Sequence, residues 1–311
     1  MRQIKEVHMY DLIIIGSGPA GLSAAIYATR AKLDFIIIEQ NFMGGGQVVN
    51  TYEIDNYPGL PGISGPDLSM KMQEHAQNLG AEFVTETVTE LDLDGDIKKV
   101  TTDMGTYEAR TVILAMGAEH RKLGTPGEDT FAGMGVSYCA TCDGAFYRKK
   151  DTAVVGGGDV AVEDAIFLAR LCNKVYVVHR RDELRAAKIL QERLFAMPNV
   201  EMVWDSTLKS IDGDGQVRSI VTVDKKDGSE RTIPVDGVFI AVGIQPISEL
   251  VSGKLDLDQG GYVIADETGA TSVPGVFVAG DLRKKQLRQI ITACADGANA
   301  VTSVQDYLIR H

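Results

Sequence analysis

A glycine-rich turn occurs twice in this chain, each time between an apolar run and a stretch with helical character. The first copy is Gly16–Gly21, with the letters GSGPAG, and the second is Gly156–Ala161, with the letters GGGDVA. The continuous apolar run before each copy is typical of a strand in a parallel sheet that is covered on both faces. Such a strand–turn–helix arrangement is typical of units that bind a dinucleotide through its pyrophosphate. The chain is therefore predicted to contain two α/β, Rossmann-like dinucleotide-binding units.

The first unit is predicted to contain a strand over Tyr10–Ile15, a helix over Pro19–Ala31 and a strand over Phe35–Ile38. Glu39 follows the second strand, 39 − 16 = 23 residues past the first glycine. An acidic residue about 20 positions after such a turn accepts hydrogen bonds from ribose hydroxyls. Glu39 is therefore a candidate ribose ligand.

The second unit repeats this plan, with strands predicted over Thr152–Val155 and Lys174–Val178 and a helix over Val160–Leu171. It ends on the basic run His179–Arg181, whose middle residue lies 180 − 156 = 24 positions past the first glycine. Cations there suit a ribose that carries a 2′-phosphate, which a carboxylate would repel. The second ligand is therefore predicted to be NADPH, with Arg185, expected just inside the next helix, near the same phosphate.

Cys139 and Cys142 form a CxxC motif between the two glycine turns. Two intervening residues allow the sulfurs to form a disulfide, and one thiolate of such a pair is commonly acidified. Asp143 follows directly and is a candidate proton donor to a departing thiolate. The alternatives are two inert cysteines or a zinc site, but zinc needs further ligands, and the nearby His120 and His179 have irregular spacing. The arrangement therefore favours an electron relay from nicotinamide to flavin to disulfide.

Three further apolar strands end near glycines. Strands over Thr111–Ala118 and Gly237–Ile244 each contain an Ala-x-Gly end, and a strand over Gly275–Val278 leads to Asp281. A carboxylate at the carboxyl end of that strand is a candidate ligand for a flavin ribityl or phosphate group. The run Gly44–Gly46 leaves the backbone bare, so that either a flat ligand approaches closely or the run is a flexible loop.

The chain has 311 residues, enough for two domains, and a formal net charge of −12. The acidic charge argues against nucleic acid or an anionic membrane as the main partner. Apolar runs fall short of the about 20 residues that a membrane helix needs, and charged residues interrupt the N-terminal segment where a signal peptide would be apolar. We therefore expect a cytoplasmic protein with no membrane partner and no metal.

Several segments together resemble the low-molecular-weight thioredoxin reductases, and the similarity covers essentially the whole chain. The segments that carry it are Gly16–Ala31, Gly45–Gly59, Cys139–Arg148, Gly156–Ala165, His179–Ala186 and Ala279–Gly297. The resemblance implies a homodimer that binds FAD and NADPH and reduces thioredoxin or a thioredoxin-like protein. It also implies that Cys142 faces the flavin and that Cys139 attacks the disulfide of thioredoxin.

The predicted site residues fall into three groups. The catalytic group is Cys139, Cys142 and Asp143. The predicted FAD contacts are Gly16, Ser17, Gly18, Pro19, Ala20, Gly21, Glu39, Gln40, Gly46, Gln47, Asn56, Val88, Met116, Gly117, Gly280, Asp281, Arg288, Gln289 and Ile290. The predicted NADPH contacts are Gly156, Gly158, Asp159, Val160, Ala161, Glu163, His179, Arg180, Arg181 and Arg185.

The predicted fold is a pair of three-layer ββα domains, with the second inserted into the first. Residues 1–120 and 246–311 are expected to form the FAD-binding domain, and residues 121–245 the NADPH-binding domain that carries the CxxC. The disulfide has to meet both the flavin and a bulky protein substrate. We therefore expect the inserted domain to rotate about linkers near Ala118–Lys122 and Gly243–Pro246.

The chain departs from the family pattern at three positions. Val160 replaces a usual Ser or Thr, which removes a hydroxyl that would bond the pyrophosphate, so weaker NADPH binding is expected. Met116 replaces a usual Thr beside the FAD, and Ala145 replaces a common aromatic residue after the CxxC. The change at Met116 is expected to alter packing beside the FAD, and the change at Ala145 is expected to alter access of the protein substrate.

Four other functions are compatible with parts of the pattern. A dithiol oxidase would pass electrons to oxygen, and a peroxide-system reductase usually carries an additional N-terminal thioredoxin-like domain. A ferredoxin-fed reductase would not need the basic run at Arg180, and a non-enzymatic redox sensor would not need two intact nucleotide sites.

Overall fold

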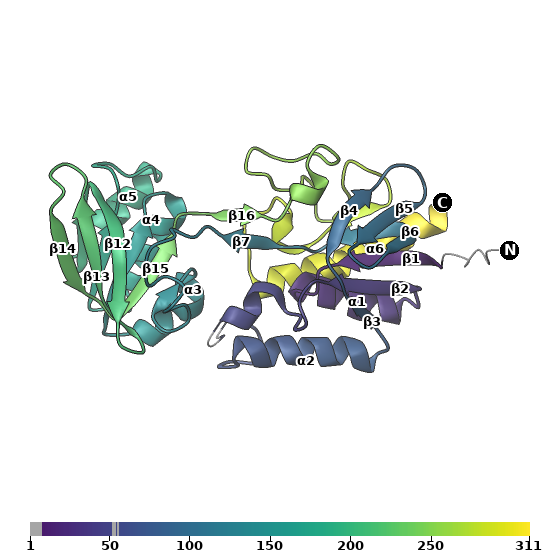
Figure 1. Cartoon of the computed structure of the whole chain (residues 1–311), viewed down its shortest axis with the longest axis horizontal. Helices are drawn as coiled ribbons and strands as arrows, with labels where there is room; N and C mark the ends of the chain where they lie inside the picture. Colours follow the sequence, from purple (N-terminus) through teal and green to yellow (C-terminus); the bar gives the residue numbers. More distant parts are fainter. Residues whose placement is uncertain (1–7, 52–53, 55) are drawn as a thin grey trace. The chain divides into compact units, whose positions relative to one another are not determined.

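The computed structural model describes residues 8–51, 54 and 56–311, which form two compact units (Figure 1). Unit 1 comprises the described parts of Met1–Val49, Ile63–Glu119 and Gln245–His311. Unit 2 comprises those of Asn50–Gly62 and His120–Ile244. The predicted fold class, with one α/β unit inserted into the sequence of another, is confirmed.

Unit 1 is built on a seven-stranded sheet in the order β3-β2-β1-β6-β5-β4, and β17 also pairs with β6. The strands are β1 (Met9–Ile15), β2 (Phe35–Glu39), β3 (Glu82–Thr85), β4 (Val88–Asp92), β5 (Lys98–Thr102), β6 (Thr106–Leu114) and β17 (Val276–Val278). The long strand β6 joins two sheet types: its first half pairs antiparallel with β5, and its second half pairs parallel with β17.

Three α-helices and three short 3-10 helices complete unit 1. They are α1 (Pro19–Arg30), α2 (Gly65–Asn78), α6 (Ile290–Arg310), η1 (Gly46–Asn50), η3 (Glu249–Val251) and η4 (Gly280–Leu282). One apolar core, which includes Leu22 and Ala300, joins α1 and α6 to the sheet, and a second core on the sheet's other face includes Leu91 and Val251. Helices α1 and α6 pack closely because Gly297 has no side chain, and a Cβ there would overlap the carbonyl oxygen of Ala20.

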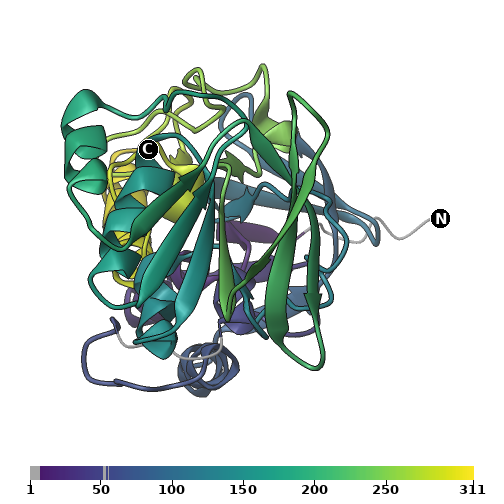
Figure 2. The same ribbon diagram turned by 90° about the vertical axis from the view of Figure 1, so that its left-hand side faces the viewer.

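Unit 2 has the same three layers on a smaller scale. Its parallel sheet has the order β11-β10-β9-β15-β8, with β8 (Val136–Ser137), β9 (Asp151–Gly156), β10 (Lys174–Val178), β11 (Val200–Val203) and β15 (Gly237–Ala241). Its helices are α3 (Ala140–Asp143), η2 (Gly144–Tyr147), α4 (Asp159–Ala169) and α5 (Lys188–Phe195). A three-stranded antiparallel sheet of β12 (Ser206–Gly213), β13 (Val217–Asp224) and β14 (Glu230–Pro234) covers the other face, in green in Figure 2.

Two short strands lie at two of the places where the chain passes from one unit to the other. Strands β7 (Ala118–His120) and β16 (Ile244–Pro246) pair with each other in a two-stranded sheet. Among the described helices, none combines the length and the apolar character that crossing a bilayer requires.

Candidate functional site

The first glycine turn connects β1 to α1, and its first and last glycines leave no room for a side chain. Gly16 has φ of 97°, and a Cβ there would lie 2.5 Å from the carbonyl oxygen of Ala115. A Cβ at Gly21 would overlap the carbonyl oxygen of Gly16. Helix α1 begins at Pro19 with no side-chain cap, which leaves amides of its first turn available to an anion. The turn therefore has the geometry of a pyrophosphate cradle.

Glu39, at the end of β2, holds this turn in place. Its Oε2 accepts hydrogen bonds from the Ser17 N–H at 2.8 Å and the Ser17 hydroxyl at 2.7 Å. Its Oε1 accepts from the Asn41 N–H at 2.9 Å. The Asn41 side-chain amide donates to the same Oε1 at 3.1 Å. The structure thus brings the predicted acidic residue to the predicted glycine turn, where its carboxylate accepts four hydrogen bonds.

The run Gly44–Gly46 packs against the first turn with its backbone. A Cβ at Gly46 would lie 3.4 Å from Gly18 Cα, and Gly45 has φ of 113°, a conformation that glycine favours. The predicted contact Gln47 donates its side-chain amide to the carbonyl oxygen of Ala118. The bare backbone of this run therefore lets Gly46 lie close to Gly18. The face of Gly18 stays open to a flat ligand.

Asp281 in η4 has a buried oxygen that accepts no hydrogen bond from the described residues. Its Oδ1 has no hydrogen-bond partner among the described residues, and Lys285 Nζ lies 3.9 Å away. Burial raises the pKa of Asp281, whereas the nearby Lys285 and Arg288 lower it. A buried, unpartnered carboxylate oxygen suits a ligand hydroxyl. The residues of unit 1 therefore fit a bound FAD.

The second glycine turn has the same construction between β9 and α4. A Cβ at Gly156 would overlap the carbonyl oxygen of Ala241, as one at Gly16 would approach Ala115. A Cβ at Gly158 would meet nothing within 4 Å, and α4 also begins without a side-chain cap. Val160 is 60% exposed on its first turn. The amides of this turn are thus open to a second dinucleotide.

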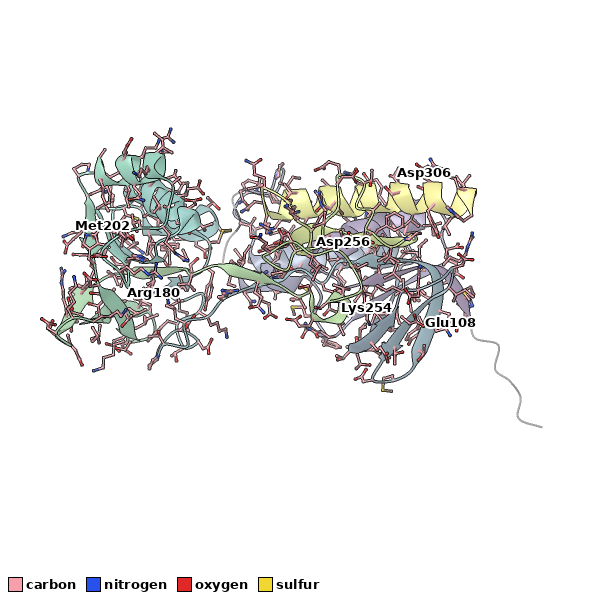
Figure 3. All side chains as sticks on the ribbon, turned by 90° about the horizontal axis from the view of Figure 1, so that it is seen from above. Glu108, Arg180, Met202, Lys254, Asp256 and Asp306 are labelled. Atoms are coloured by element: carbon pink, nitrogen blue, oxygen red, sulfur yellow. A yellow bond between two sulfur atoms is a disulfide. The ribbon has the colours of Figure 1, made fainter. Side chains whose placement is uncertain are left out.

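The basic residues after β10 divide into one buried ring and three exposed guanidinium groups. His179 is 5% exposed, its ring fills the space beside Gly157, and burial lowers its pKa. Arg180 (labelled in Figure 3), Arg181 and Arg185 are exposed. The Arg185 N–H donates to the Gly157 carbonyl oxygen at 2.8 Å, which ties the arginine loop to the turn.

The predicted helical position of Arg185 is wrong. Helix α5 begins at Lys188, after a loop in which the Ala187 N–H donates to Asp159 Oδ1 at 2.7 Å. The N–H groups of Arg185 and Ala187 are thus bound to the glycine turn and to Asp159. The segment around Arg185 is therefore a loop, and the helix begins only after it.

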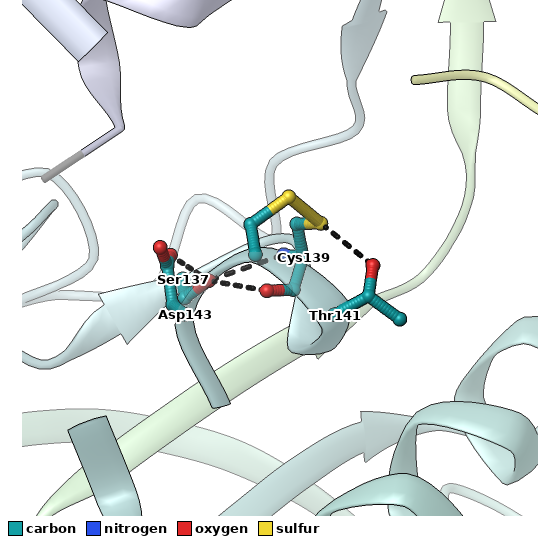
Figure 4. Close-up of a disulfide and its surroundings, with 5 residues drawn as sticks. Ser137, Cys139, Thr141 and Asp143 are labelled. Atoms are coloured by element: carbon teal, nitrogen blue, oxygen red, sulfur yellow. Dashed lines mark hydrogen bonds between the residues drawn. A yellow bond between two sulfur atoms is a disulfide. The ribbon is translucent and has the colours of Figure 1, made fainter. Parts of the chain in front are cut away.

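Cys139 and Cys142 form a disulfide at the start of α3, with their Cα atoms 5.3 Å apart (Figure 4). Both cysteines are partly buried, and Thr141 Oγ1 lies 3.4 Å from Cys139 Sγ. Gly144, the next residue after α3, packs against Phe167 of α4. The described residues contain no group of three or more His, Cys, Asp or Glu that could hold a metal. The CxxC therefore occurs as a redox-capable pair on the surface of unit 2.

Asp143 directly follows Cys142 in α3 and is partly buried. Its Oδ2 accepts a hydrogen bond from the Ser137 hydroxyl at 2.6 Å, and its Oδ1 is buried without a partner among the described residues. Burial raises the pKa of Asp143, and the hydrogen bond from Ser137 opposes that rise. A carboxyl group whose pKa is raised holds its proton more firmly, which suits a proton donor. Sequence reasoning missed Ser137 because no spacing rule connects it to Asp143.

The other predicted contacts lie on several elements of the two units. Met116 and Gly117 follow Ala115 in unit 1, and Arg288 places its guanidinium 3.9 Å from the centre of the Tyr262 ring. Gln289 caps α6, which begins at Ile290. Asn56 lies in the segment that groups with unit 2. The remaining predicted contacts occupy these same turns and strand ends: Gln40 follows β2, Val88 begins β4, Gly280 begins η4, and Ala161 and Glu163 are in α4.

The model of one protein family, described as pyridine nucleotide-disulphide oxidoreductase, matches residues 10–297. The chain therefore belongs to this family of oxidoreductases, which use FAD and NADPH.

The individual relatives of this chain belong to one kind of enzyme within the family. The thioredoxin reductase of Listeria innocua is 50% identical over 97% of this chain and 95% of the relative. That of Bacillus subtilis is 46% identical over 98% and 96%. A crystal structure of the thioredoxin reductase from Streptococcus pyogenes is 49% identical, with a TM-score of 0.92 over 97% of this chain and 99% of that one. The resemblance to thioredoxin reductases is thus confirmed.

Proposed function

We propose that this chain is an NADPH-dependent thioredoxin-disulfide reductase that passes two electrons through FAD to the Cys139–Cys142 disulfide and on to thioredoxin. The observation that carries the proposal is the disulfide with its adjacent buried carboxyl, Asp143, on a unit that has its own dinucleotide turn. Curated thioredoxin reductases about as long as this chain support it at 50% identity.

In this proposal unit 1 holds FAD and unit 2 holds NADPH. The amides at the start of α1 bind the FAD pyrophosphate, Glu39 accepts from the ribose, and Asp281 Oδ1 accepts from a ribityl hydroxyl. The exposed Arg180 and Arg181 bind the 2′-phosphate of NADPH. These assignments follow from the open glycine turns, the unpartnered Asp281 oxygen and the exposed arginines.

Bound FAD and NADPH supply the hydride and electron-transfer chemistry. The chain supplies the acceptor: the Cys139–Cys142 bond breaks, takes up two electrons, and a proton from Asp143 reaches one departing sulfur. Cys139 then attacks the thioredoxin disulfide, and Cys142 resolves the mixed disulfide. Because the pair serves a flavin and a protein in turn, unit 2 rotates on the β7 and β16 connections.

Anaerobic titration of the purified flavoprotein tests the whole relay. NADPH is expected to bleach the flavin quickly, NADH to do so more slowly, and oxidised thioredoxin to restore the colour with sustained NADPH consumption. Bleaching by neither nucleotide, with bleaching by reduced ferredoxin, would assign the chain to a ferredoxin-fed reductase. Nucleotide oxidation that continues with oxygen and without thioredoxin would assign it to a dithiol oxidase.

Two variants test the separate steps. Cys142→Ser is expected to trap a mixed disulfide between thioredoxin and Cys139, and a trap formed only by Cys139→Ser would reverse the two roles. An engineered crosslink that fixes the two units to each other is expected to abolish turnover, and full activity in the crosslinked enzyme would exclude the rotation.

We also propose that the chain works as a homodimer in the cytoplasm. The family resemblance supports the dimer, and light scattering of the FAD-loaded protein, with an expected mass of twice 33.6 kDa, tests it. Fractionation of cells tests the location.

A further inference from the structure

Ser137 is almost inaccessible and lies two residues before Cys139 in the sequence. It ends β8, where it pairs with Phe239 of β15, and its side chain is among the buried polar groups at 5% exposure. A serine hydroxyl has one proton to donate and two lone pairs with which to accept. The contacts of this single hydroxyl determine what it does.

The hydroxyl links the backbone of Cys139 to the carboxyl of Asp143. Ser137 Oγ accepts a hydrogen bond from the Cys139 N–H at 3.1 Å and donates to Asp143 Oδ2 at 2.6 Å (Figure 4). The carbonyl oxygen of Cys139 lies farther away, at 3.3 Å, so the short contact to Asp143 takes the hydroxyl proton. One side chain thus fixes both the nucleophilic cysteine and its acid.

The two oxygens of Asp143 consequently differ. Oδ2 is bound to Ser137, whereas Oδ1 is buried and has no partner among the described residues. When Asp143 is protonated, its proton lies on Oδ1, because Oδ2 already accepts a short hydrogen bond. The orientation that Ser137 imposes decides which oxygen is available to exchange a proton.

We propose that Ser137 is a positioning residue of the redox centre, which holds Asp143 Oδ2 so that Oδ1 delivers the proton to the departing cysteine sulfur. This inference rests on the proposed function. The hydride equivalent from NADPH brings two electrons and one proton, and a dithiol needs two protons. When the S–S bond breaks, the second proton leaves Asp143 Oδ1 for sulfur, and the resulting carboxylate keeps the Ser137 hydrogen bond until solvent reprotonates it.

The two elements packed against α3, η2 and α4, each carry a titratable group with a raised pKa. Tyr147 in η2 stays neutral, because burial and the charges of Asp143, Asp236 and Cys172 raise its pKa to about 12. Asp164 in α4 lies one turn before Phe167, which contacts Gly144. Its pKa is raised to about 7 by burial and by Glu163. A pH profile of the redox centre therefore has to be compared with one from Asp164→Asn, in which this second carboxyl is absent.

The experiment compares Ser137→Ala, Ser137→Thr and Asp143→Asn in the full-length holoenzyme. The rate of dithiol formation after mixing with NADPH is followed as flavin recovery across pH, and the thiols are counted with a thiol reagent. Because the Ser137 donor stabilises the carboxylate, its loss moves the alkaline decline in rate upward by about one pH unit. Ser137→Thr keeps the hydroxyl and is expected to keep the wild-type midpoint. Asp143→Asn is expected to lose this decline and to slow the step about 100-fold.

A purely structural role for Ser137 would lower the rate at every pH and leave the midpoint unchanged, which would overturn the inference. If Ser137→Ala does not retain FAD, Ser137→Cys, with a weaker donor, replaces it and is expected to move the midpoint in the same direction by less. A wild-type enzyme that forms no dithiol with NADPH would overturn the proposed function instead, so the two failures are distinguishable.

Discussion

Asp296 Oδ1 lies 2.8 Å from Arg283 Nη2 inside unit 1, where both side chains are almost fully buried. The other oxygen of Asp296 accepts from Lys285 Nζ and from the Gly280 N–H, each at 2.9 Å. One carboxylate therefore holds two cations and the turn that presents Asp281. The sequence pattern alone did not single out this cluster.

Replacing Asp296 by Ala is expected to destabilise the protein by about 3–5 kcal/mol, because Arg283 and Lys285 would remain as buried charges without their counter-ion. The matched control is Glu267→Ala. Glu267 also contacts Arg283 Nη2, at 3.3 Å, but it is 83% exposed, so its loss is expected to cost less than about 1 kcal/mol. Thermal unfolding of the two variants checks this, and equal losses would contradict it.

The middle and last glycines of the second turn are expected to respond differently to a methyl group. A Cβ at Gly158 meets nothing within 4 Å, so Gly158→Ala is expected to keep the melting temperature close to that of the wild type and to raise the KM for NADPH. A Cβ at Gly157 would overlap the His179 ring, so Gly157→Ala is expected to cost about 1–3 kcal/mol of stability. Melting curves and steady-state kinetics separate the effects, and a large loss of stability in Gly158→Ala would contradict the open cradle.

Val160→Thr is expected to tighten nucleotide binding. The residue is 60% exposed on the first turn of α4, where the added hydroxyl can donate to a pyrophosphate at a gain of about 1 kcal/mol, or a roughly fivefold lower KM. The pyrophosphate is common to both nucleotides, so the KM values for NADPH and NADH should fall together. Arg180→Gln is the control, because it should raise only the KM for NADPH. A Val160→Thr enzyme with unchanged KM values would mean that the backbone amides already satisfy the pyrophosphate.

Asp164 is expected to make stability depend on pH. Its pKa in the folded protein is about 7, against a model-compound value of 3.8, so the folded state binds its proton more tightly. The stabilisation that this proton provides is complete below about pH 4 and is lost as the pH rises through 7. Asp164→Asn stays neutral, so it should match the wild type near pH 4 and exceed it by about 2 kcal/mol above pH 7. Melting temperatures measured across this range, with Glu163→Gln as the control that removes only the neighbouring charge, check the sign.

The local parts of the fold could be predicted because their causes are local. A helix begins at Pro19 and a strand covers Lys174–Val178, both as predicted, since the glycine turn fixes the first and an unbroken apolar run fixes the second. Glu39 was predictable from its distance along the chain, because the length of one βαβ unit determines that distance.

Features that depend on long-range packing could not be predicted in this way. Ser137 is buried where β8 pairs with β15, and that pairing joins segments about a hundred residues apart in the sequence. Arg185 was assigned to a helix because its neighbours favour one, whereas its N–H is bound to Gly157. The buried charges of Arg283 and Asp296 resemble ordinary surface residues in sequence, because their burial depends on how α6 packs.

The packing of Gly297 against Ala20 joins two helices, α1 and α6, that are far apart in the sequence. The ribosome makes the first glycine turn early, yet the helix that covers it, α6, is the last element of the chain, and β17 precedes it only shortly. The whole parallel sheet of unit 2 is translated well before α6, so unit 2 can fold while unit 1 is still incomplete. The cradle for the first dinucleotide is thus begun first and completed last, and a nascent chain that stalls before α6 carries a finished redox disulfide unit attached to an open, unfinished one.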